Sequence, residues 1–309
     1  MKIAFVFPGQ GSQSVGMLAE LAEKFPVIEA TFAQASEVLG YDLWKLVQKG
    51  PDEALNATHK TQPAMLASGV AVWRLWQQQG GTRPSVLAGH SLGEYTALVC
   101  ADAMPFSEAI RLVEARGRFM QNAVAAGEGG MAAILGLDDA AVIALCEANS
   151  QGEVLEAVNF NTPGQVVIAG TANAVNRAVA NAVDAGAKKA VPLPVSVPSH
   201  CALMKPAAEK LKTTLADIEI TTPAIPVIHN VDVVTLSTTD EIKDALVRQL
   251  FQPVQWVKTI NKMLEEGAEQ VVECGPGKVL AGLNKRITRR TPAFPILDVA
   301  SLEKALASK

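Results

Sequence analysis

The chain has 309 residues, 49% of them hydrophobic and 19% charged, which is enough apolar material for one large core or two domains and excludes a disordered or fibrous protein. Its net charge of −4 and isoelectric point near 5.7 give no overall reason to bind nucleic acid or an anionic membrane. The apolar run Ile3–Phe7 is too short for the core of a signal peptide, and no segment approaches the ~18 apolar residues that span a bilayer. We therefore expect a cytoplasmic protein with no membrane or nucleic-acid partner.

The first third of the sequence predicts alternating strands and helices. An apolar strand at Ile3–Phe7 leads into a glycine-rich turn. Pro63 is expected to begin a long helix that continues to Trp76 and is ended by Gly80-Gly81. A further helix is expected to begin after Ser107, which would be its N-cap, and to run to about Val124.

Between these helices, the five residues Gly89-His90-Ser91-Leu92-Gly93 separate the apolar run Val86-Leu87-Ala88 from the helix-like run Glu94–Leu98. A strand, a sharp turn with small residues two positions before and after a serine, and a helix are typical of a nucleophile elbow. Such a turn would hold the Ser91 hydroxyl out at the sheet edge, beside free N–H groups of a helix N-terminus that can stabilise a negative tetrahedral intermediate. The alternative is an ordinary glycine-bracketed turn that contains a serine.

A cluster of glycines at positions 127, 129 and 130 marks a change of pattern, which we interpret as a domain junction. The order that follows is strand, helix, strand, strand, helix, strand, which is the ferredoxin-like arrangement. These predicted elements are Met131–Leu135, Asp138–Asn149, Val154–Phe160, Gln165–Ala169, Ala172–Ala185 and Lys189–Leu193, with a turn at Asn161–Gly164.

A proline-rich stretch from Pro192 to Pro198 then leads back into α/β texture. Its predicted elements are strands at Val227–Asn230 and Gln270–Cys274 and a helix from about Asp240 to Leu250. We therefore predict an α/β fold with two domains. The large one is an α/β-hydrolase-like domain with a parallel sheet, residues 1–126 and 197–309, and the small one is an inserted ferredoxin-like domain, residues 127–196.

A serine hydroxyl becomes a good nucleophile when a base takes its proton, and histidine is the usual base near neutral pH. His200 follows the rigid approach Val197-Pro198-Ser199 at the return from the inserted domain, where an interdomain cleft would place a site. His90 adjoins Ser91 on a sharp turn and should point elsewhere, in a packing or hydrogen-bonding role. His59 lies in a polar run expected as a surface loop, and His229 ends a predicted strand, either as a core histidine or lining a cleft.

A base histidine also needs an acceptor for its second nitrogen, and no Asp or Glu falls in an obvious motif for that position. The helix that ends near Gln249 leaves its last carbonyls unpaired, and one of them could accept the His200 N–H. The alternative for Gln249 is a solvated helix end. Arg116 falls on the apolar arc of its predicted helix, so its guanidinium faces inward and requires an anion. That anion is either an internal Asp or Glu or a substrate carboxylate held by two hydrogen bonds.

Two glycine-rich turns resemble nucleotide-binding motifs without matching them. The turn Pro8–Gln13 lacks the last glycine of a dinucleotide fingerprint, and Gly275–Lys278 lacks the spacing of a P-loop. A better role for the first turn is to bring the backbone N–H of Gln10 toward the elbow across the sheet edge, where it would complete an oxyanion hole. The four cysteines lack the spacing of a metal site or CxxC motif and are expected as reduced thiols, at Cys100, Cys146, Cys201 and Cys274.

Six motifs together carry a specific resemblance to a known family. They are Phe7-Pro8-Gly9-Gln10-Gly11-Ser12-Gln13, Gly89-His90-Ser91-Leu92-Gly93-Glu94-Tyr95, Arg116-Gly117 with Met120, Asn159-Phe160-Asn161, Pro198-Ser199-His200, and Gln249 ahead of Pro253-Val254-Gln255-Trp256. Over nearly its whole length the sequence resembles the bacterial malonyl-CoA:acyl carrier protein transacylases of fatty-acid synthesis. One departure is Val197-Pro198-Ser199-His200, which matches neither form that precedes this histidine in relatives inside polyketide synthases.

The resemblance implies Ser91 as the acylated nucleophile, His200 as general base and acid, and Arg116 as the ligand of the free malonyl carboxylate. It implies an oxyanion hole formed by the backbone N–H groups of Gln10 and Leu92, and a Gln249 main-chain carbonyl that orients His200. The implied activity transfers malonyl from malonyl-CoA to the phosphopantetheine thiol of acyl carrier protein through a malonyl-serine, with no metal and no cofactor.

Three other functions stay open at this point: a serine thioesterase or esterase, an acyltransferase for another acyl-CoA in polyketide synthesis, and an idle docking subunit of a larger synthase. Acyl carrier proteins are acidic as a class, so this net-negative chain would need local positive charge to bind one. The densest candidate patch is Lys285, Arg286, Arg289 and Arg290, with Lys188-Lys189 as the second choice. The alternative for the first patch is a solvated helix face.

Overall fold

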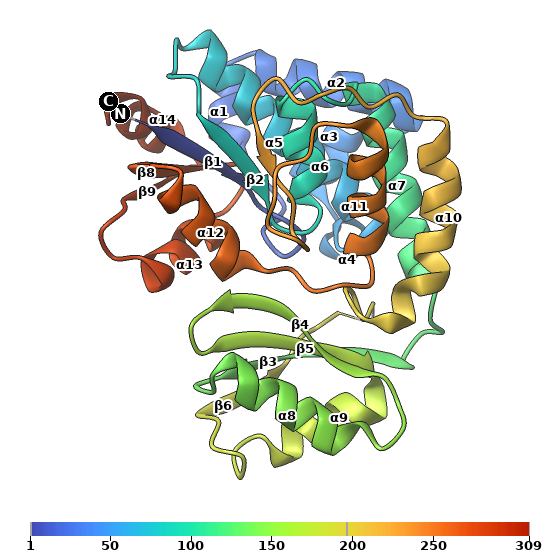
Figure 1. Cartoon of the computed structure of the whole chain (residues 1–309). Helices are drawn as coiled ribbons and strands as arrows, with labels where there is room; N and C mark the ends of the chain where they lie inside the picture. The colour runs from blue at the N-terminus through green and yellow to red at the C-terminus, as the bar shows by residue number, and fades with distance from the viewer. Residues whose placement is uncertain (1, 196, 309) are drawn as a thin grey trace.

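Two sheets organise the chain in the computed structural model, which describes residues 2–195 and 197–308 (Figure 1). The first is a parallel sheet with the strand order β7-β2-β1-β8-β9. The second is an antiparallel sheet with the order β4-β5-β3-β6. The strands of the parallel sheet are β1 (Ile3–Phe7), β2 (Val86–Gly89), β7 (Val227–Ile228), β8 (Gln270–Cys274) and β9 (Ala293–Ile296). The predicted α/β fold with a parallel sheet is confirmed.

The parallel sheet lies between two layers of helices, as Figure 1 shows. Successive side chains of a strand point to opposite faces of its sheet. Phe5 and Phe7 of β1 therefore pack on one face, in a cluster with helices α2, α5, α6 and α7. Ala4 and Val6 pack on the other face, in a cluster with α12 and α13. The helices of this large unit are α1 (Ala19–Lys24), α2 (Val27–Leu39), α3 (Leu43–Lys49), α4 (Asp52–Leu55), α5 (Thr58–Gln78), α6 (Gly93–Cys100), α7 (Phe106–Gln121), α10 (Lys205–Ala216), α11 (Thr239–Gln249), α12 (Trp256–Glu265), α13 (Val279–Ile287) and α14 (Val299–Ala307), with a 3-10 turn, η1, at Ala202–Met204.

The antiparallel sheet and two helices form a smaller unit with the predicted chain order of strand, helix, strand, strand, helix, strand. Its elements are β3 (Gly129–Leu135), α8 (Asp139–Ser150), β4 (Leu155–Thr162), β5 (Gln165–Thr171), α9 (Ala172–Asn181) and β6 (Lys189–Pro192). Both helices cover the face of the sheet that points away from the large unit (Figure 1). The other face packs toward the large unit, where Met131 and Val158 join a cluster with Cys201.

The two units are joined by main-chain contacts as well as by the chain itself. The Phe160 N–H donates to the Val254 carbonyl at 3.0 Å, and the Val254 N–H donates to the Val158 carbonyl at 2.8 Å. Where the chain enters and leaves the small unit, Gly129 lies so close to the Pro198 ring that a Cβ at Gly129 would stand 2.5 Å from it. The predicted boundary residue Ser196 lies outside the described residues.

Several predicted boundaries were wrong. Helix α5 begins at Thr58, five residues before Pro63, so His59 lies in a helix and not in a surface loop. Helix α7 begins at Phe106 after an extended Pro105, which places Ser107 inside the helix, and it ends at Gln121. The turn between β4 and β5 is only Pro163-Gly164, because β4 continues through Thr162. Local preferences place Pro63 at the start of a helix, but α5 packs against α7 and begins one turn earlier, so that Pro63 lies inside it.

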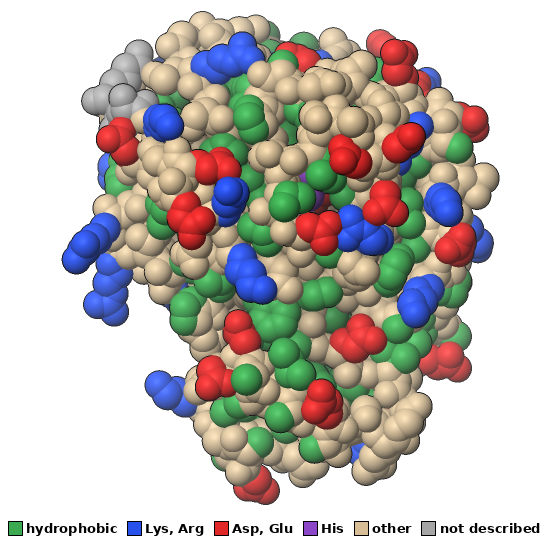
Figure 2. Space-filling view, in the orientation of Figure 1, with side chains coloured by type: hydrophobic (Ala, Val, Ile, Leu, Met, Phe, Trp, Pro, Cys, Tyr) green, Lys and Arg blue, Asp and Glu red, His purple; other side chains and the backbone are tan. Residues whose placement is uncertain are grey.

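The surface in the orientation of Figure 1 carries interspersed acidic and basic side chains, with hydrophobic ones between the two units (Figure 2). Lys and Arg side chains project at the left edge of this view, over α13 and the loop that follows it. Within the described part of the chain, no helix is long and apolar enough to cross a bilayer.

Candidate active site

The turn between β2 and α6 has the backbone geometry of a nucleophile elbow. Ser91 adopts a φ of 53°, in the left-handed region that non-glycine residues rarely occupy. Side chains at the flanking glycines would not fit, because a Cβ at Gly89 would overlap the Gly93 backbone and a Cβ at Gly93 would overlap the Phe7 carbonyl. The small residues therefore allow the tight turn, and the strained serine stands at the start of helix α6.

His200 is hydrogen-bonded to Ser91 across 109 residues of sequence. Its Nε2 lies 2.8 Å from Ser91 Oγ, and its Nδ1 lies 2.7 Å from the main-chain carbonyl oxygen of Gln249. A carbonyl oxygen only accepts, so Nδ1 carries the proton and Nε2 is free to accept the proton of the serine hydroxyl. Burial, aided by the nearby Arg116 charge, lowers the pKa of His200 to about 3, so the ring is neutral at physiological pH. This is the protonation state that a general base requires.

Arg116 projects from α7 into the same site and is 1% exposed. Its Nη2 lies 3.0 Å from Gln249 Oε1 and 3.5 Å from Ser91 Oγ, and its guanidinium carbon lies 5.3 Å from the centre of the Tyr95 ring. Its buried Nε has no hydrogen-bond partner in the described structure. Among the described residues no Asp or Glu forms an ion pair with Arg116, which removes the internal salt bridge from the two alternatives. A buried cation with an unused donor beside the serine is suited to a bound carboxylate.

The turn after β1 meets the elbow at close range. A Cβ at Gly9 would lie 2.5 Å from the His90 carbonyl oxygen, so only glycine lets the two turns approach this far. Gln10 and Leu92 both line the pocket that contains Ser91. Leu92 is the N-cap of α6, where backbone N–H groups have no partner within the helix. The pocket thus brings together the two residues whose N–H groups were predicted to form the oxyanion hole.

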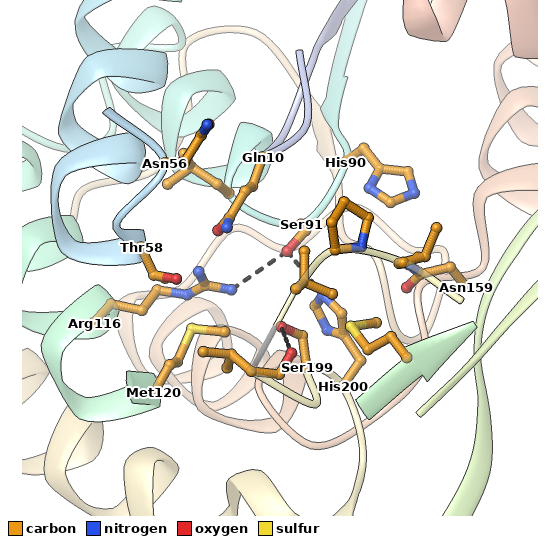
Figure 3. Close-up of a pocket in the computed structure, with 16 residues that line it drawn as sticks. Gln10, Asn56, Thr58, His90, Ser91, Arg116, Met120, Asn159, Ser199 and His200 are labelled. Carbon is orange, nitrogen blue, oxygen red and sulfur yellow. Dashed lines mark hydrogen bonds between the residues drawn. The ribbon is translucent and has the colours of Figure 1, made fainter. Parts of the chain in front are cut away.

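Both units line this pocket (Figure 3). The large unit supplies the reactive groups just described together with Asn56, Thr58 and Met120, while Met131, Asn159 and Leu193 come from the small unit. In the close-up, Arg116 and His200 approach Ser91 from different sides, and both hydrogen bonds converge on its hydroxyl. The site is therefore a cleft between two units, as the position of His200 in the sequence predicted.

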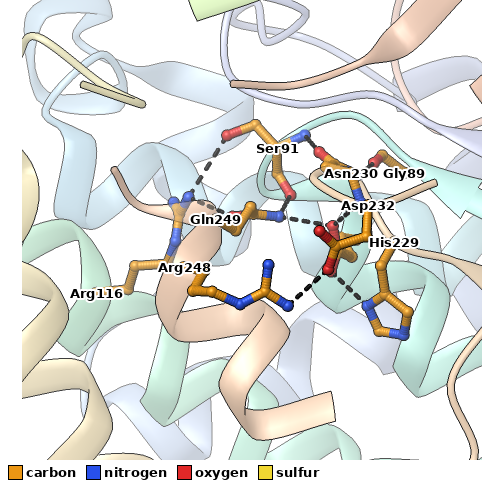
Figure 4. A network of polar contacts seen from close by, with 9 residues as sticks. Gly89, Ser91, Arg116, His229, Asn230, Asp232, Arg248 and Gln249 are labelled. Carbon is orange, nitrogen blue, oxygen red and sulfur yellow. Dashed lines mark hydrogen bonds and ion pairs between the residues drawn. The ribbon is translucent and has the colours of Figure 1, made fainter. Parts of the chain in front are cut away.

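Sequence reasoning missed Asn230, which directly supports the elbow. Its Oδ1 accepts the Ser91 N–H at 2.7 Å, and its Nδ2 donates to the Gly89 carbonyl at 2.6 Å (Figure 4). One amide therefore holds the turn at two backbone groups, one on each side of His90, directly ahead of the strained serine. Its position in the sequence could have indicated this role, because Asn230 follows a buried parallel strand and the carboxyl ends of parallel strands lie at the same edge of the sheet as Ser91.

The other three histidines have structural partners. His90 Nε2 lies 2.8 Å from Asn161 Oδ1, and its ring packs on Trp256 with centroids 5.3 Å apart, which matches the predicted hydrogen-bonding and packing role. His229 is a core histidine at 1% exposed, and its Nδ1 lies 2.7 Å from Glu94 Oε1. His59 Nδ1 lies 2.7 Å from Gln121 Oε1. None of these contacts reaches the Ser91 hydroxyl.

The predicted docking patch lies on the last turn of α13 and the loop beyond it. Lys285, Arg286, Arg289 and Arg290 are all exposed. Arg286 Nη1 donates to Gln165 Oε1 at 2.8 Å, which places the patch at the junction with the small unit. The four cysteines are buried thiols, and within residues 2–195 and 197–308 no three His, Cys, Asp or Glu side chains are grouped to hold a metal ion.

The elbow serine, the neutral histidine bonded to it and a guanidinium that has no ion-pair partner among the described residues define a serine acyl-transfer site on an α/β fold. A model of the acyl transferase domain family matches residues 4–300. The malonyl CoA-acyl carrier protein transacylase of Salmonella typhimurium is 59% identical over 305 residues, which are 99% of each chain. An acyl carrier protein S-malonyltransferase from Vibrio cholerae superposes with a TM-score of 0.96 at 60% identity, covering 98% of this chain and 99% of the other.

A malonyl-transacylase solved in complex with a type II PKS acyl-carrier protein superposes with a TM-score of 0.99 at 56% identity over the full length of both chains. This chain belongs to the malonyl CoA-acyl carrier protein transacylase family.

Proposed function

We infer that this protein transfers the malonyl group from malonyl-CoA to the phosphopantetheine thiol of acyl carrier protein and so supplies extender units for fatty-acid synthesis. Full-length relatives at 59% and 60% identity support the reaction. The observation that carries it is the 2.8 Å contact between Ser91 Oγ and His200 Nε2, with the buried Arg116 directly beside it. An acylation centre next to a fixed cation suits an acyl group that ends in a carboxylate.

In the proposed mechanism His200 takes the Ser91 proton on Nε2 while Oγ attacks the malonyl thioester carbonyl. The Gln249 carbonyl, 2.7 Å from Nδ1, stabilises the imidazolium that forms. The tetrahedral intermediate collapses when the C–S bond breaks, and His200 returns its proton to the departing thiolate of coenzyme A. In the second half-reaction His200 deprotonates the carrier thiol, which attacks the malonyl-serine ester and releases Ser91 as a hydroxyl. No cofactor or metal enters this chemistry.

We propose that the backbone N–H groups of Gln10 and Leu92 donate hydrogen bonds to the oxyanion of both tetrahedral intermediates. The close approach of Gly9 to the His90 carbonyl and the position of Leu92 at a helix N-terminus support this assignment. We assign Arg116 to the free malonyl carboxylate, because its buried Nε is an unused donor and its other contacts are to neutral groups. Met120 and the small unit would shape the space around the acyl group.

We also propose that residues 1–126 and 197–309 form an α/β-hydrolase-like domain and that residues 127–196 form a ferredoxin-like domain inserted in it. The strand order β4-β5-β3-β6 and the contact between Gly129 and Pro198 support an insertion whose two ends adjoin.

We propose a cytoplasmic location, where the carrier and coenzyme A substrates of fatty-acid synthesis occur. We also propose that acidic carrier proteins bind at Lys285, Arg286, Arg289 and Arg290, which are exposed beside the junction of the two units.

The test is intact-mass analysis of the protein after brief exposure to malonyl-CoA, with and without a phosphopantetheinylated carrier protein. We expect one malonyl group on Ser91, no label on Ser91→Ala, and transfer of the label to the carrier when it is added. Peptide mapping that locates the acyl group on another residue would overturn the assignment of the nucleophile. Loss of the label to water at one rate, whether or not the carrier is present, would identify a thioesterase instead.

A further inference from the structure

The carboxylate of Glu94 lies beneath the elbow and is completely buried, at 0% exposed. Its Oε1 is 2.7 Å from His229 Nδ1, while its Oε2 accepts the Asn230 N–H and the side-chain N–H of Gln249, each at 2.9 Å. Glu94 stands on the first turn of α6, three residues after the serine. One carboxylate therefore connects the elbow helix to the end of β7 and to the end of α11.

These contacts fix which way the Gln249 amide faces. Its Nε2 donates to Glu94 Oε2 and to the Ser91 carbonyl oxygen, both at 2.9 Å. Both partners only accept when the carboxylate is ionised, so the NH₂ end of the amide must face them and a flipped amide would set oxygen against oxygen. The Oε1 end is thereby directed at Arg116 Nη2, 3.0 Å away. The carboxylate and the Ser91 carbonyl together ensure that the guanidinium meets the oxygen of the Gln249 amide and not its NH₂ group.

The same glutamine holds the base through its main chain, since its carbonyl oxygen accepts from His200 Nδ1 at 2.7 Å. The last turn of α11 is secured further by Arg248, whose Nη2 pairs with Asp232 at 2.6 Å (Figure 4). In that view Gln249 lies between Ser91 and Arg116, with Asn230 on the other side of the serine. Gln249 therefore contacts the residues assigned as nucleophile, base and carboxylate ligand.

We propose that Glu94 is the positioning residue for malonyl recognition: it orients the Gln249 amide, which orients the Arg116 guanidinium so that its remaining donors face the acyl carboxylate. The proposal rests on the proposed function, because it takes Arg116 as the malonyl ligand. Glu94 itself does not line the pocket and touches no reacting atom. Its role is exerted through Gln249, so it should change selectivity among acyl groups and not only the overall rate.

The experiment compares the rate constants for acylation of Ser91 by malonyl-CoA and acetyl-CoA in wild type and Glu94→Gln. A glutamine at 94 keeps the size but can turn a donor toward Gln249, which leaves the Ser91 carbonyl to hold the NH₂ end of the amide, so the Gln249 oxygen is directed at Arg116 less firmly. We expect the malonyl-to-acetyl ratio of kcat/KM to fall by about tenfold or more. The matched control is Thr96→Val on the same helix, which is isosteric, 1% exposed and removes a hydroxyl with no hydrogen-bond partner in the described structure. Its ratio should stay at the wild-type value.

A folded Glu94→Gln that loses rate equally on both acyl groups, or keeps both rates, would overturn the proposal. The variant Gln249→Met removes the amide but keeps the main-chain carbonyl, so it should lose the same selectivity, and the double variant should be no less selective than Gln249→Met alone. If Glu94→Gln does not fold, a wild-type acyl ratio in Gln249→Met overturns the proposal and a lost ratio supports it. Absence of any malonyl-serine in wild type would instead reject the proposed function.

Discussion

The parallel sheet and the antiparallel sheet enclose the site from two sides and contribute different kinds of residue to it. In the parallel sheet β1, β2 and β8 are buried at every position, whereas β3 and β4 contain both buried and half-buried positions. A sheet that is covered on both faces can present polar groups only where its strands end. A sheet with one face free of helices can line a cavity along its length.

The difference explains where the reactive groups lie. Ser91 follows β2 and Asn230 follows β7, both at the carboxyl edge of the parallel sheet, and His200 is held against them by the end of α11. The small unit contributes Met131 and Asn159 to the pocket wall and Asn161 as the partner of His90. We expect that changes on the large-unit side stop the chemistry and that changes on the small-unit side only adjust it.

The largest effect is expected for His200→Ala. Without the base at 2.8 Å from Oγ, both half-reactions should slow by about 10²- to 10⁴-fold. Rapid-quench measurement of Ser91 acylation, and of transfer from preformed malonyl-enzyme to the carrier, would report the two steps separately. A loss below tenfold in both steps would show that another group removes the serine proton.

Arg116→Ala should come next, with a loss of about 2 to 5 kcal/mol in transition-state stabilisation for malonyl-CoA and a relative gain on acetyl-CoA. Arg116→Lys should rescue poorly, because an ammonium cannot supply a planar pair of donors. Steady-state kcat/KM for the two thioesters is the measurement. Equal losses on both acyl groups, with unfolding at a lower temperature, would indicate that the guanidinium is structural.

The buried His200 should also displace the pH dependence of acylation. Burial lowers its pKa below the ordinary 6.5, to about 3, so the base stays neutral and the acid limb of kcat/KM for malonyl-CoA should fall well below pH 6.5. The same shift makes stability depend on pH. Between pH 6.5 and the lower pKa of the folded state, the unfolded chain binds a proton at this histidine and the native protein does not, so the free energy of unfolding declines as the pH falls through that window. His200→Gln should flatten that decline in urea titrations. An acid limb centred at pH 6.5 or above would contradict the buried neutral ring.

On the small-unit side, Asn161→Ala removes the acceptor 2.8 Å from His90 Nε2. We expect about 1 kcal/mol of lost stability, because a half-buried imidazole nitrogen would lose its hydrogen-bond partner, and a change in acylation rate of less than about tenfold. Denaturant unfolding and acylation kinetics on the same samples would test this. A loss of activity as large as that of His200→Ala would remove the contrast between the two units.

The smallest effect is expected at the exposed patch. Lys285→Glu with Arg286→Glu should slow transfer to the carrier by about 3- to 10-fold at low salt and flatten its ionic-strength dependence, with acylation by malonyl-CoA nearly unchanged, because rim charges govern encounter. Lys210→Glu with Lys212→Glu is the matched control, since both lysines are exposed on α10, well away from α13 in Figure 1. Unchanged carrier kinetics at low salt would move the search to Lys188-Lys189.

The sequence by itself determined the elements that depend on near neighbours. The elbow is readable because Gly89 and Gly93 must be small for the chain to turn within five residues, and the strand and helix order of the small unit follows from apolar spacing. The inward face of Arg116 also follows from helical spacing. Helix starts were less reliable: α5 begins before Pro63 and α7 before Ser107, because packing outweighs local preference at helix ends.

Only the tertiary structure decided which polar groups meet. Ser91 pairs with a histidine 109 residues away and with an asparagine 139 residues away, and the Gln249 side chain reaches the Ser91 carbonyl across 158 residues. Glu94 reads in the sequence as an ordinary first-turn acid, yet it is buried beneath the elbow and bonded to three distant groups. A hydrogen bond needs its donor and acceptor within about 3 Å, and that proximity is set by how the strand ends and α11 pack together, which no local pattern records.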